Sequence, residues 1–417
     1  MSIPPDTAAP AAVSAAVADA HRRDWARVLA ATVRVTRDLD LAEECVQEAY
    51  LTALTAWQGG VPTSPAAWLT TSARNRALDR VRRAAVLQRK LPLLIEPEPV
   101  QQPEAGGAFP DDRLRLVFTC CHPALAVEAQ IALTLRLVCG LTTPEVAKAL
   151  LTAETTMAAR ITRAKKKIAA ARIPYRVPTA EQLPERVDAV LHVVHLLYTA
   201  GHTAADGPAL TRPDLAGRAL DLARMLRLLL PQDREVAGLL ALILLTDARR
   251  ATRVDDAGRL QLLDAQDRSR WDRDAIAEGD ALVRLALTAR PPGRYALQAA
   301  IAAVHAGSAR FEDTDWAEIV ALYDLLLQRW PSPVVALNRA VAVGLAHGPL
   351  AGLEALDALA AEPQLARYPY LAASRADVLA RLGRAEEARL AYDEALVFTA
   401  NEAERDFLLD RRTRLGV

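Results

Sequence analysis

The sequence is poor in aromatic residues, which make up 5% of its 417 residues, and it contains few runs of β-branched residues. About half of the residues are hydrophobic, and Ala and Leu are abundant. This composition predicts an all-α protein. The longest apolar run, 236–245, is too short to span a bilayer. Residues 1–19 lack the features of a secretion signal and resemble a flexible Ala/Pro tail, so we expect a soluble cytoplasmic protein that does not contact membranes.

Cysteine is also scarce, with four residues and no CxxC spacing. A disulfide framework is therefore not expected, which suits a reducing compartment. Cys120, Cys121 and His122 are adjacent, but neighbouring ligands rarely complete a tetrahedral metal site, so buried thiols are the favoured interpretation.

Histidine offers a second possible metal set, because His192 and His195 share a helix face and His202 follows. No nearby Cys or carboxylate completes this set, so we predict neither a metal nor a cofactor. The sequence also lacks a Gly-rich phosphate loop, an HExxH pair, a GxSxG elbow and a Cys/His nucleophile arrangement, so an enzyme is not expected.

The chain has no net charge, but its charges are unevenly distributed. Residues 1–172 contain 22 Lys and Arg against 17 Asp and Glu, whereas residues 173–417 contain 29 against 34. All five lysines lie in the first part. A basic front and an acidic rear indicate a DNA-binding half joined to a half with another role.

Residues 141–172 predict a helix-turn-helix. We expect Thr143 to cap a first helix that has Pro144 in its first turn and ends near Leu150. Residues 151–154 then form the turn, and Thr155 caps the second helix.

The second of these helices has two different faces. Its apolar stripe consists of Met157, Ile161, Ala164 and Ile168. The opposite face carries Thr156, Arg160, Arg163 and Lys167. A capped helix with a cationic face suits insertion into the major groove, although an ordinary helical hairpin with a solvated basic face is the alternative.

Two further charged helices lie upstream. The first is predicted to open at Asp40 with Glu43 as a capping box. Its apolar face is Ala42, Cys45, Val46, Ala49, Ala53 and Trp57, and its acidic face is Glu43, Glu44, Gln47 and Glu48. The second begins at Ser64 and Pro65 and carries Arg74, Arg76, Arg80, Arg82 and Arg83 against Asp79. Both surfaces are compatible with partner binding or with simple solvation.

The motifs AEECVQEAYLTAL and PAAWLTTSARNRALDRVRR, in this order, resemble region 2 of bacterial RNA polymerase sigma factors of the extracytoplasmic-function (ECF) type. Residues 128–168 resemble region 4 of the same factors. The resemblance covers residues 20–172 and implies region 2 at 20–86, a flexible linker at 87–112 and region 4 at 113–172. Five prolines in residues 87–112 independently exclude a single helix there.

The resemblance implies roles for individual residues. Glu44, Gln47 and Glu48 would dock on the β′ clamp helices of core RNA polymerase, and region 4 would contact the β flap. The loop 58–65 and the arginine helix would capture and melt the −10 promoter element through Arg74, Asn75, Arg76, Arg80 and Arg83. Region 4 would read the −35 element through Thr156, Arg160, Arg163, Lys166 and Lys167. For Trp68 a core role is favoured over stacking on a flipped base.

The remaining 245 residues form an extension. Helices are predicted near 185–200, 213–230 and 233–248, in a helical part that spans 173–290. Residues 291–417 resemble tetratricopeptide (TPR) repeats, with Gly383, Ala388, Tyr392 and Ala395 at the repeat offsets and Gly344 and Gly348 near another turn. The charged clusters 247–253, 264–273 and 404–412 fit internal pairing or an interaction surface equally well.

These observations predict a sigma factor that binds core polymerase, recognises two promoter elements and melts one of them. The extension is expected to regulate or enable activity through the sigma domains or a further protein. The alternative is a helix-turn-helix regulator whose C-terminal half senses a ligand or partner. That alternative leaves the acidic helix and the arginine helix without a purpose.

Overall fold

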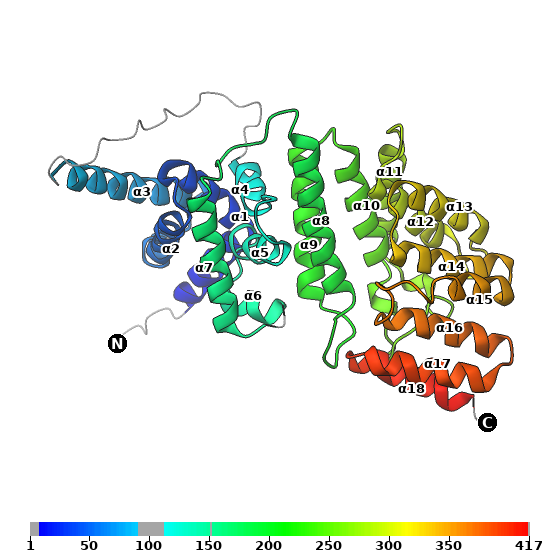
Figure 1. Cartoon of the computed structure of the whole chain (residues 1–417). Coiled ribbons are helices and arrows are strands. Elements are labelled where there is room, and N and C mark those ends of the chain that lie inside the picture. The colour runs from blue at the N-terminus through cyan, green and yellow to red at the C-terminus, as the bar shows by residue number, and fades with distance from the viewer. Residues whose placement is uncertain (1–7, 91–111, 151, 416–417) are drawn as a thin grey trace, which may run out of the picture. The chain divides into compact units, whose positions relative to one another are not determined.

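A computed structural model describes residues 8–90, 112–150 and 152–415 (Figure 1). Helices make up 73% of these described residues, and the extended pairings among them are two isolated bridges, Gly207 with Asn401 and Val254 with Leu260. The predicted all-α fold class is therefore confirmed. None of the helices in these ranges combines the length and the apolar character needed to cross a membrane. The chain divides into two compact units, Met1–Val193 (unit 1) and Val194–Val417 (unit 2).

Unit 1 begins with three helices that pack on one another. These are α1 (Ala8–Thr36), α2 (Leu39–Ala56) and α3 (Pro65–Lys90), with a 3₁₀ turn η1 (Trp57–Gly59) after α2. The following elements are α4 (Asp112–Cys120), α5 (Val127–Leu133), the π-helical turn η2 (Thr134–Val138), α6 (Thr143–Ala149) and α7 (Glu154–Ala170). The predicted linker, 87–112, lies mostly outside the described residues; its ends belong to α3 and α4.

The start of α2 differs from the predicted one. Arg37 has a φ of +55°, which ends α1 and leaves Asp38 in the extended conformation of an N-cap. The Asp38 carboxylate accepts a hydrogen bond from the backbone N–H of Leu41 at 2.9 Å, so Asp38 caps the helix and Asp40 lies inside it. The predicted apolar face of α2 is confirmed as buried.

Helix α1 begins inside the stretch that was expected to be a flexible tail. It includes Val13 and Val17, and both side chains are buried. The Ala-rich composition that suggested a tail is also the composition with the highest helix propensity. Burial of these two valines by the rest of unit 1 favours the helix.

The first helix of the helix-turn-helix has a capping box one residue earlier than predicted. The Thr142 hydroxyl accepts from the N–H of Glu145, and the Glu145 carboxylate accepts from the N–H of Thr142 at 2.7 Å. Thr142 therefore replaces Thr143 as the cap. The helix ends at Ala149, with Leu150 as its C-cap, as expected.

The second helix of the motif, α7, begins at Glu154, so the predicted cap Thr155 lies inside it. Ala153 occupies the N-cap position and makes no side-chain hydrogen bond. Position 151 of the predicted turn lies outside the described residues. The predicted apolar stripe is confirmed as buried: Met157, Ile161, Ala164 and Ile168.

The chain that follows α7 remains attached to unit 1. The Tyr175 hydroxyl donates to the carbonyl of Ala30 at 2.8 Å, and burial raises the pKa of Tyr175. Arg186, near the start of α8 (Leu183–His202), donates to the carbonyl of Phe118. These contacts explain why the compact unit extends to Val193, beyond residue 172, at which the resemblance ends.

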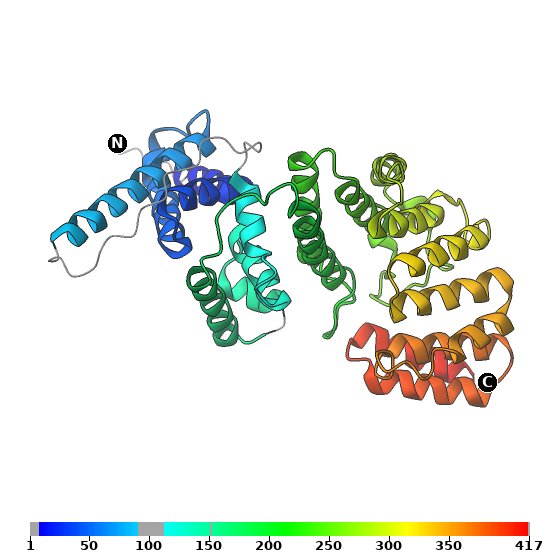
Figure 2. The ribbon, with the colours of Figure 1, turned by 45° about the horizontal axis from the view of Figure 1, so that its top comes forward.

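Unit 2 comprises the second half of α8 and a series of helices packed in sequential pairs (Figure 2). The first are α9 (Pro213–Leu229), α10 (Arg234–Asp247), α11 (Arg273–Ala286), α12 (Arg294–Gly307) and α13 (Trp316–Arg329). Then come α14 (Pro333–His347), α15 (Pro349–Asp357), α16 (Pro369–Arg381), α17 (Ala385–Phe398) and α18 (Glu402–Arg414). Two 3₁₀ turns, η3 (Arg250–Thr252) and η4 (Arg268–Arg270), join α10 to α11. The three predicted helical segments correspond to α8, α9 and α10.

Helical hairpins occupy the part of unit 2 that resembles TPR repeats. Gly383 lies at the turn between α16 and α17 with a φ of +73°, and three repeat positions are buried beside it: Ala388, Tyr392 and Ala395. Gly348, with a φ of +98°, forms the turn between α14 and α15, whereas Gly344 lies within α14 and packs against Gly352. The assignment of these hairpins to the TPR family stays a prediction.

Internal contacts account for much of the charge in the three C-terminal clusters. Asp247 pairs with Arg250, and Arg411 lies 2.6 Å from Asp377. Arg268 is buried, and its guanidinium donates to backbone carbonyls. These observations favour the internal-pairing interpretation of these clusters.

Substitution of Gly238 by Ala is expected to destabilise unit 2 by about 1–3 kcal/mol. A Cβ atom on Gly238 in α10 would lie 2.6 Å from the backbone nitrogen of Ala296 in α12, so the two helices would have to separate. Gly217 in α9 is the matched control, because its Cβ meets open space; Gly217→Ala should stabilise the helix by about 0.5–1 kcal/mol. Urea unfolding measures both changes, and equal effects would contradict the proposed close packing.

Candidate nucleic-acid interface

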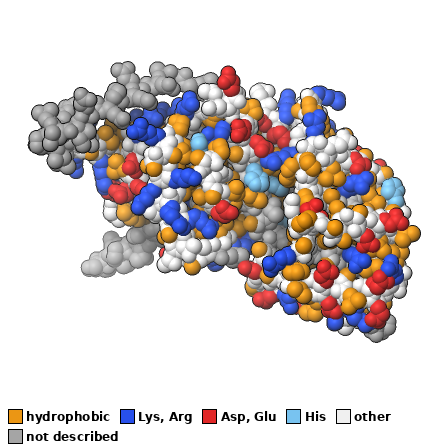
Figure 3. Space-filling model, in the orientation of Figure 1, with side chains coloured by type: hydrophobic (Ala, Val, Ile, Leu, Met, Phe, Trp, Pro, Cys, Tyr) orange, Lys and Arg blue, Asp and Glu red, His pale blue; other side chains and the backbone are white. Residues whose placement is uncertain are grey.

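Helix α7 presents polar and basic side chains on the side opposite its buried stripe. Its stripe packs on α5 and α6, which fixes the orientation of the helix. The predicted contact residues Thr156, Arg163, Lys166 and Lys167 are exposed, and Arg160 is half-buried. Lys and Arg side chains gather over this part of the surface in Figure 3. The arrangement provides a convex cationic helix of the kind that enters a major groove.

A buried ion-pair cluster joins α2 to η2 and α7. Glu43, predicted to lie on an acidic exposed face, is 5% exposed and pairs with Arg136 of η2. Its other carboxylate oxygen lies 2.8 Å from Nζ of Lys165, which in turn lies 2.6 Å from Asp40. We call these four residues the Glu43 cluster.

The protonation of the Glu43 cluster follows from its contacts. Burial disfavours the Lys165 ammonium, but the carboxylates of Glu43 and Asp40 outweigh this effect and raise the pKa of Lys165.

A separate hydrogen bond, from the Trp25 indole to the carbonyl of Leu137 at 3.0 Å, joins α1 to η2. Regions 2 and 4 of the predicted scheme are therefore directly linked within unit 1.

The arginines of α3 point in two directions. Arg80 lies 2.8 Å from the Glu44 carboxylate and also pairs with Glu48, and Arg76 lies 3.6 Å from Glu48. The proximity of Glu48 is the main cause that raises the pKa of Arg80. Arg76 and Arg80, which were predicted to contact DNA, therefore form ion pairs with residues that were predicted to contact polymerase. The sequence did not reveal this pairing.

The other predicted residues of α3 face solvent: Arg74, Asn75 and Arg83. Gln47, the remaining predicted polymerase contact on α2, is also exposed. These four side chains are accessible to partners in the described arrangement.

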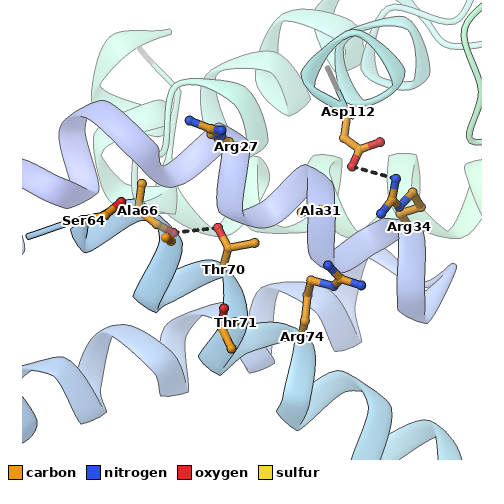
Figure 4. A pocket seen from close by; sticks show the side chains of 10 residues that line it. Arg27, Ala31, Arg34, Ser64, Ala66, Thr70, Thr71, Arg74 and Asp112 are labelled. Carbon is orange, nitrogen blue, oxygen red and sulfur yellow. Dashed lines mark hydrogen bonds and ion pairs between the residues drawn. The ribbon is translucent and has the colours of Figure 1, made fainter. Parts of the chain in front are cut away.

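A pocket of about 470 Å³ opens between α1, the start of α3 and the beginning of α4 (Figure 4). Its basic lining consists of Arg27, Arg34 and Arg74, and its hydroxyl groups come from Ser64, Thr70 and Thr71. Asp112 also lines it, and its carboxylate lies 3.6 Å from the Arg34 guanidinium. This combination of guanidinium groups and hydroxyls can hold phosphate oxygens.

Arg27 and Arg34 were not among the predicted site residues. They are seven positions apart on α1, which places them on one helix face, and this spacing was visible in the sequence. The packing of α1 against α3, which places them beside Arg74, was not. Pairing of helices that are distant in sequence depends on tertiary contacts rather than local pattern.

Trp68 is half-buried and packs against a core side chain of unit 1, so the core role favoured from the sequence stays a prediction. Its ring lies edge-on to that of Trp57 with centroids 5.7 Å apart, and Trp57 is 1% exposed. The loop between η1 and α3 begins at Gly60, whose φ of +133° is reserved for glycine. The loop is therefore anchored by the Trp pair at both of its ends.

The cysteines near the start of region 4 are buried. Burial raises the pKa of Cys121 to about 11, and burial also raises that of Cys120. Both thiols are therefore protonated at neutral pH and poorly suited to bind metal. Among the described residues, no group of three His, Cys, Asp or Glu side chains is placed to hold a metal ion.

Three family models match the chain. Sigma-70 region 2 matches residues 20–86, and sigma-70 region 4 matches residues 115–168. A family of unknown function matches residues 186–287. The two sigma matches coincide with the helices that carry the α3 and α7 surfaces.

One relative is similar along most of its length. An uncharacterised protein of Rhizobium meliloti (strain 1021), R00370, is 43% identical over 390 residues, which cover 92% of each chain. No solved structure matches the chain. The similarity includes the extension as well as the sigma regions, so the two parts occur together in both proteins.

Proposed function

The chain belongs to the sigma-70 family, as an ECF-like sigma factor for promoter recognition and transcription initiation, and from this premise we propose which of its surfaces meet each partner. The surface formed by Thr156, Arg160, Arg163, Lys166 and Lys167 on α7 reads the −35 element. The observation that carries this proposal is the orientation of α7, whose apolar stripe is buried while its basic face is free.

The −10 element is assigned to α3, the loop 58–65 and the adjoining pocket. Arg74, Asn75 and Arg83 supply accessible contacts, while Arg76 and Arg80 become available when their pairing with α2 is exchanged for DNA. The pocket residues Arg27 and Arg34 receive backbone phosphates of the opened strand. The arginines of α3 and of the pocket would thus bind the backbone of the melted DNA beside the loop 58–65. Strand separation requires such an arrangement.

Core RNA polymerase is assigned to α2, through Glu44, Gln47 and Glu48 on the β′ clamp helices, and to region 4 on the β flap. Exposure of Glu44 and Gln47 supports the first contact. Sigma-70 regions are non-enzymatic, so we infer that the protein directs the polymerase without catalysing a reaction itself. We place its action in the cytoplasm, where polymerase and promoter meet.

The extension is proposed to regulate or enable this activity. Its paired helices provide a surface of the kind that binds other proteins, and the relative that retains both halves supports a joint role. The alternative of a helix-turn-helix regulator without polymerase is not favoured, because it gives region 2 no role.

Charge reversal on α7 tests the proposed function. Arg163→Glu in the full-length protein is expected to lower transcription from its promoter at least tenfold, because a cation near the phosphates is replaced by an anion. Lys167→Ala should weaken binding of the holoenzyme uniformly and reduce the salt slope of log K by about one. Reconstituted transcription with core polymerase measures the first effect and filter binding the second.

The control for this test is Arg284→Glu, which reverses a 73%-exposed arginine on α11 of unit 2. It should leave transcription unchanged. Equal losses from Arg163→Glu and Arg284→Glu, or no loss from Arg163→Glu, would overturn the assignment of α7.

A further inference from the structure

A second cavity, of about 220 Å³, lies within unit 2 among α10, α12, α13 and α14. Most of its wall is apolar, with Leu245, Ile301 and Leu326 among the side chains that line it. Its polar lining consists of Thr246, Arg249, Gln298, His305, Tyr323 and Asn338. Pockets for drug-sized ligands occupy roughly 300–1,000 Å³, so this cavity suits a smaller molecule.

Arg249 contributes a positive charge to the cavity without a counter-ion. In the described part of the chain, no carboxylate forms an ion pair with its guanidinium, and no acceptor takes a hydrogen bond from it. Burial lowers the pKa of Arg249, and the neighbouring Arg268 acts in the same direction. Arg249 is half-buried, and a charge held partly out of water without a partner is costly, so a bound anion would stabilise it.

The two neighbouring arginines donate hydrogen bonds to protein oxygens, although the buried Nε of Arg268 has no partner among the described residues, and this bonding distinguishes them from Arg249. Arg253 donates to the carbonyl of His202 and, at 3.0 Å, to the hydroxyl of Thr203. Arg268 donates at 2.8 Å to the carbonyls of His305 and Ser308. Of these three arginines, Arg249 is the one that lines the cavity, and its guanidinium is left for a ligand.

His305 adds a second uncommitted polar group to the same wall. Its Nδ1 atom is buried and has no hydrogen-bond partner among the described residues. Burial, together with Arg249 and Arg268, lowers the pKa of His305 to about 4, so the ring is neutral at pH 7. A neutral ring with an N–H at Nδ1 can donate to an oxygen held by Arg249.

We propose that this cavity binds a small organic monocarboxylate, whose carboxylate pairs with Arg249 and whose apolar body lies against Leu245, Ile301 and Leu326. A single free guanidinium matches one negative charge. A phosphate ester, with about two charges at neutral pH, would need a second cation in the wall, and neither Arg253 nor Arg268 lines the cavity. The apolar walls favour an organic anion over an inorganic one.

The position of the cavity gives such a ligand a structural consequence. Its first wall, α10, belongs to the segment 186–287 that matches a family of unknown function, and its other walls belong to the hairpins that follow. A ligand in the cavity would therefore contact both parts of unit 2 and stabilise their packing against each other. This inference does not depend on how the sigma regions bind DNA.

Thermal unfolding of the full-length protein tests the proposal. Benzoate and hexanoate at constant ionic strength are expected to raise the melting temperature, whereas benzamide and hexanamide, which have the same shapes without the charge, are not. Arg249→Met should lower the affinity for these carboxylates at least about tenfold, as measured by titration calorimetry. Without ligand, Arg249→Met should melt at a higher temperature than the wild type, because an unpaired, half-buried charge is replaced by an apolar side chain.

Arg284→Met, which removes an exposed arginine, is the matched control and should respond to carboxylates as the wild type does. The proposal is overturned if neither carboxylate stabilises the wild type, or if amides act as strongly as carboxylates. It is also overturned if Arg249→Met keeps the full response. A sodium sulfate arm distinguishes an inorganic anion site, and a response to sulfate equal to that to benzoate would likewise reject an organic ligand.

Discussion

Replacing Glu43 by Gln is expected to destabilise the packing of α2 against η2 and α7 by about 3–5 kcal/mol. The substitution leaves Arg136 and Lys165 without their shared carboxylate at a position that is 5% exposed. Backbone amides in α2 and α7 should then exchange with deuterium about a hundredfold faster or more, as measured by mass spectrometry of the full-length protein.

Asp40→Asn provides the control within the same cluster. Asp40 also pairs with Lys165, but its side chain is 70% exposed, so its loss should cost less than about 1 kcal/mol. The raised pKa of Lys165 sets the pH range of the effect. Its contribution is complete below the ordinary lysine value of about 10.4 and is lost as the pH rises through the higher folded value. Similar exchange rates in Glu43→Gln and Asp40→Asn would refute the role of burial.

The Glu43 cluster also has a consequence for transcription. The −35 and −10 elements are about 25 base pairs apart, or about 85 Å along B-form DNA at 3.4 Å per pair. The cluster holds the two proposed reading regions in direct contact, so it has to open before both elements are bound. At temperatures where the variant stays folded, Glu43→Gln is therefore expected to increase the rate of promoter binding by the holoenzyme. A decrease, in a variant with unchanged helical content, would contradict this expectation.

Arg80→Glu is expected to reduce transcription at least tenfold. It places a third carboxylate beside Glu44 and Glu48 and removes a proposed phosphate contact of the −10 strand. Reconstituted transcription with core polymerase measures the loss. The single variant alone does not separate a structural role from a role in binding.

A charge exchange separates these two roles. Arg80→Glu combined with Glu48→Arg restores an ion pair between α3 and α2 with reversed polarity. If the residues bind DNA and polymerase as proposed, the double variant regains thermal stability but not transcription, because both partners now meet the wrong charge. Recovery of both properties would show that the pair is only structural.

The sequence alone determined the helical fold class and which face of α7 is buried. Periodicity placed Met157, Ile161, Ala164 and Ile168 on the buried side of α7 and the basic residues on the other, and the structure confirms the buried stripe. Local rules worked because the spacing of apolar residues on a single helix is set by the helix geometry itself. The same rules placed the caps of α2, α6 and α7 one or two residues too late, because several hydroxyl or carboxylate residues stand near each start.

The tertiary structure decided what each charge does. Glu43 and Glu44 are neighbours in the sequence and looked equivalent, yet one is buried against Arg136 and Lys165 and the other reaches Arg80 at the surface. Arg249 resembled any member of a charged cluster, yet Arg250 pairs with Asp247 and Arg253 donates to Thr203, whereas Arg249 lines a cavity. A charge acquires its role from groups that are distant along the chain and from its exposure to water, and neither is encoded in a local pattern.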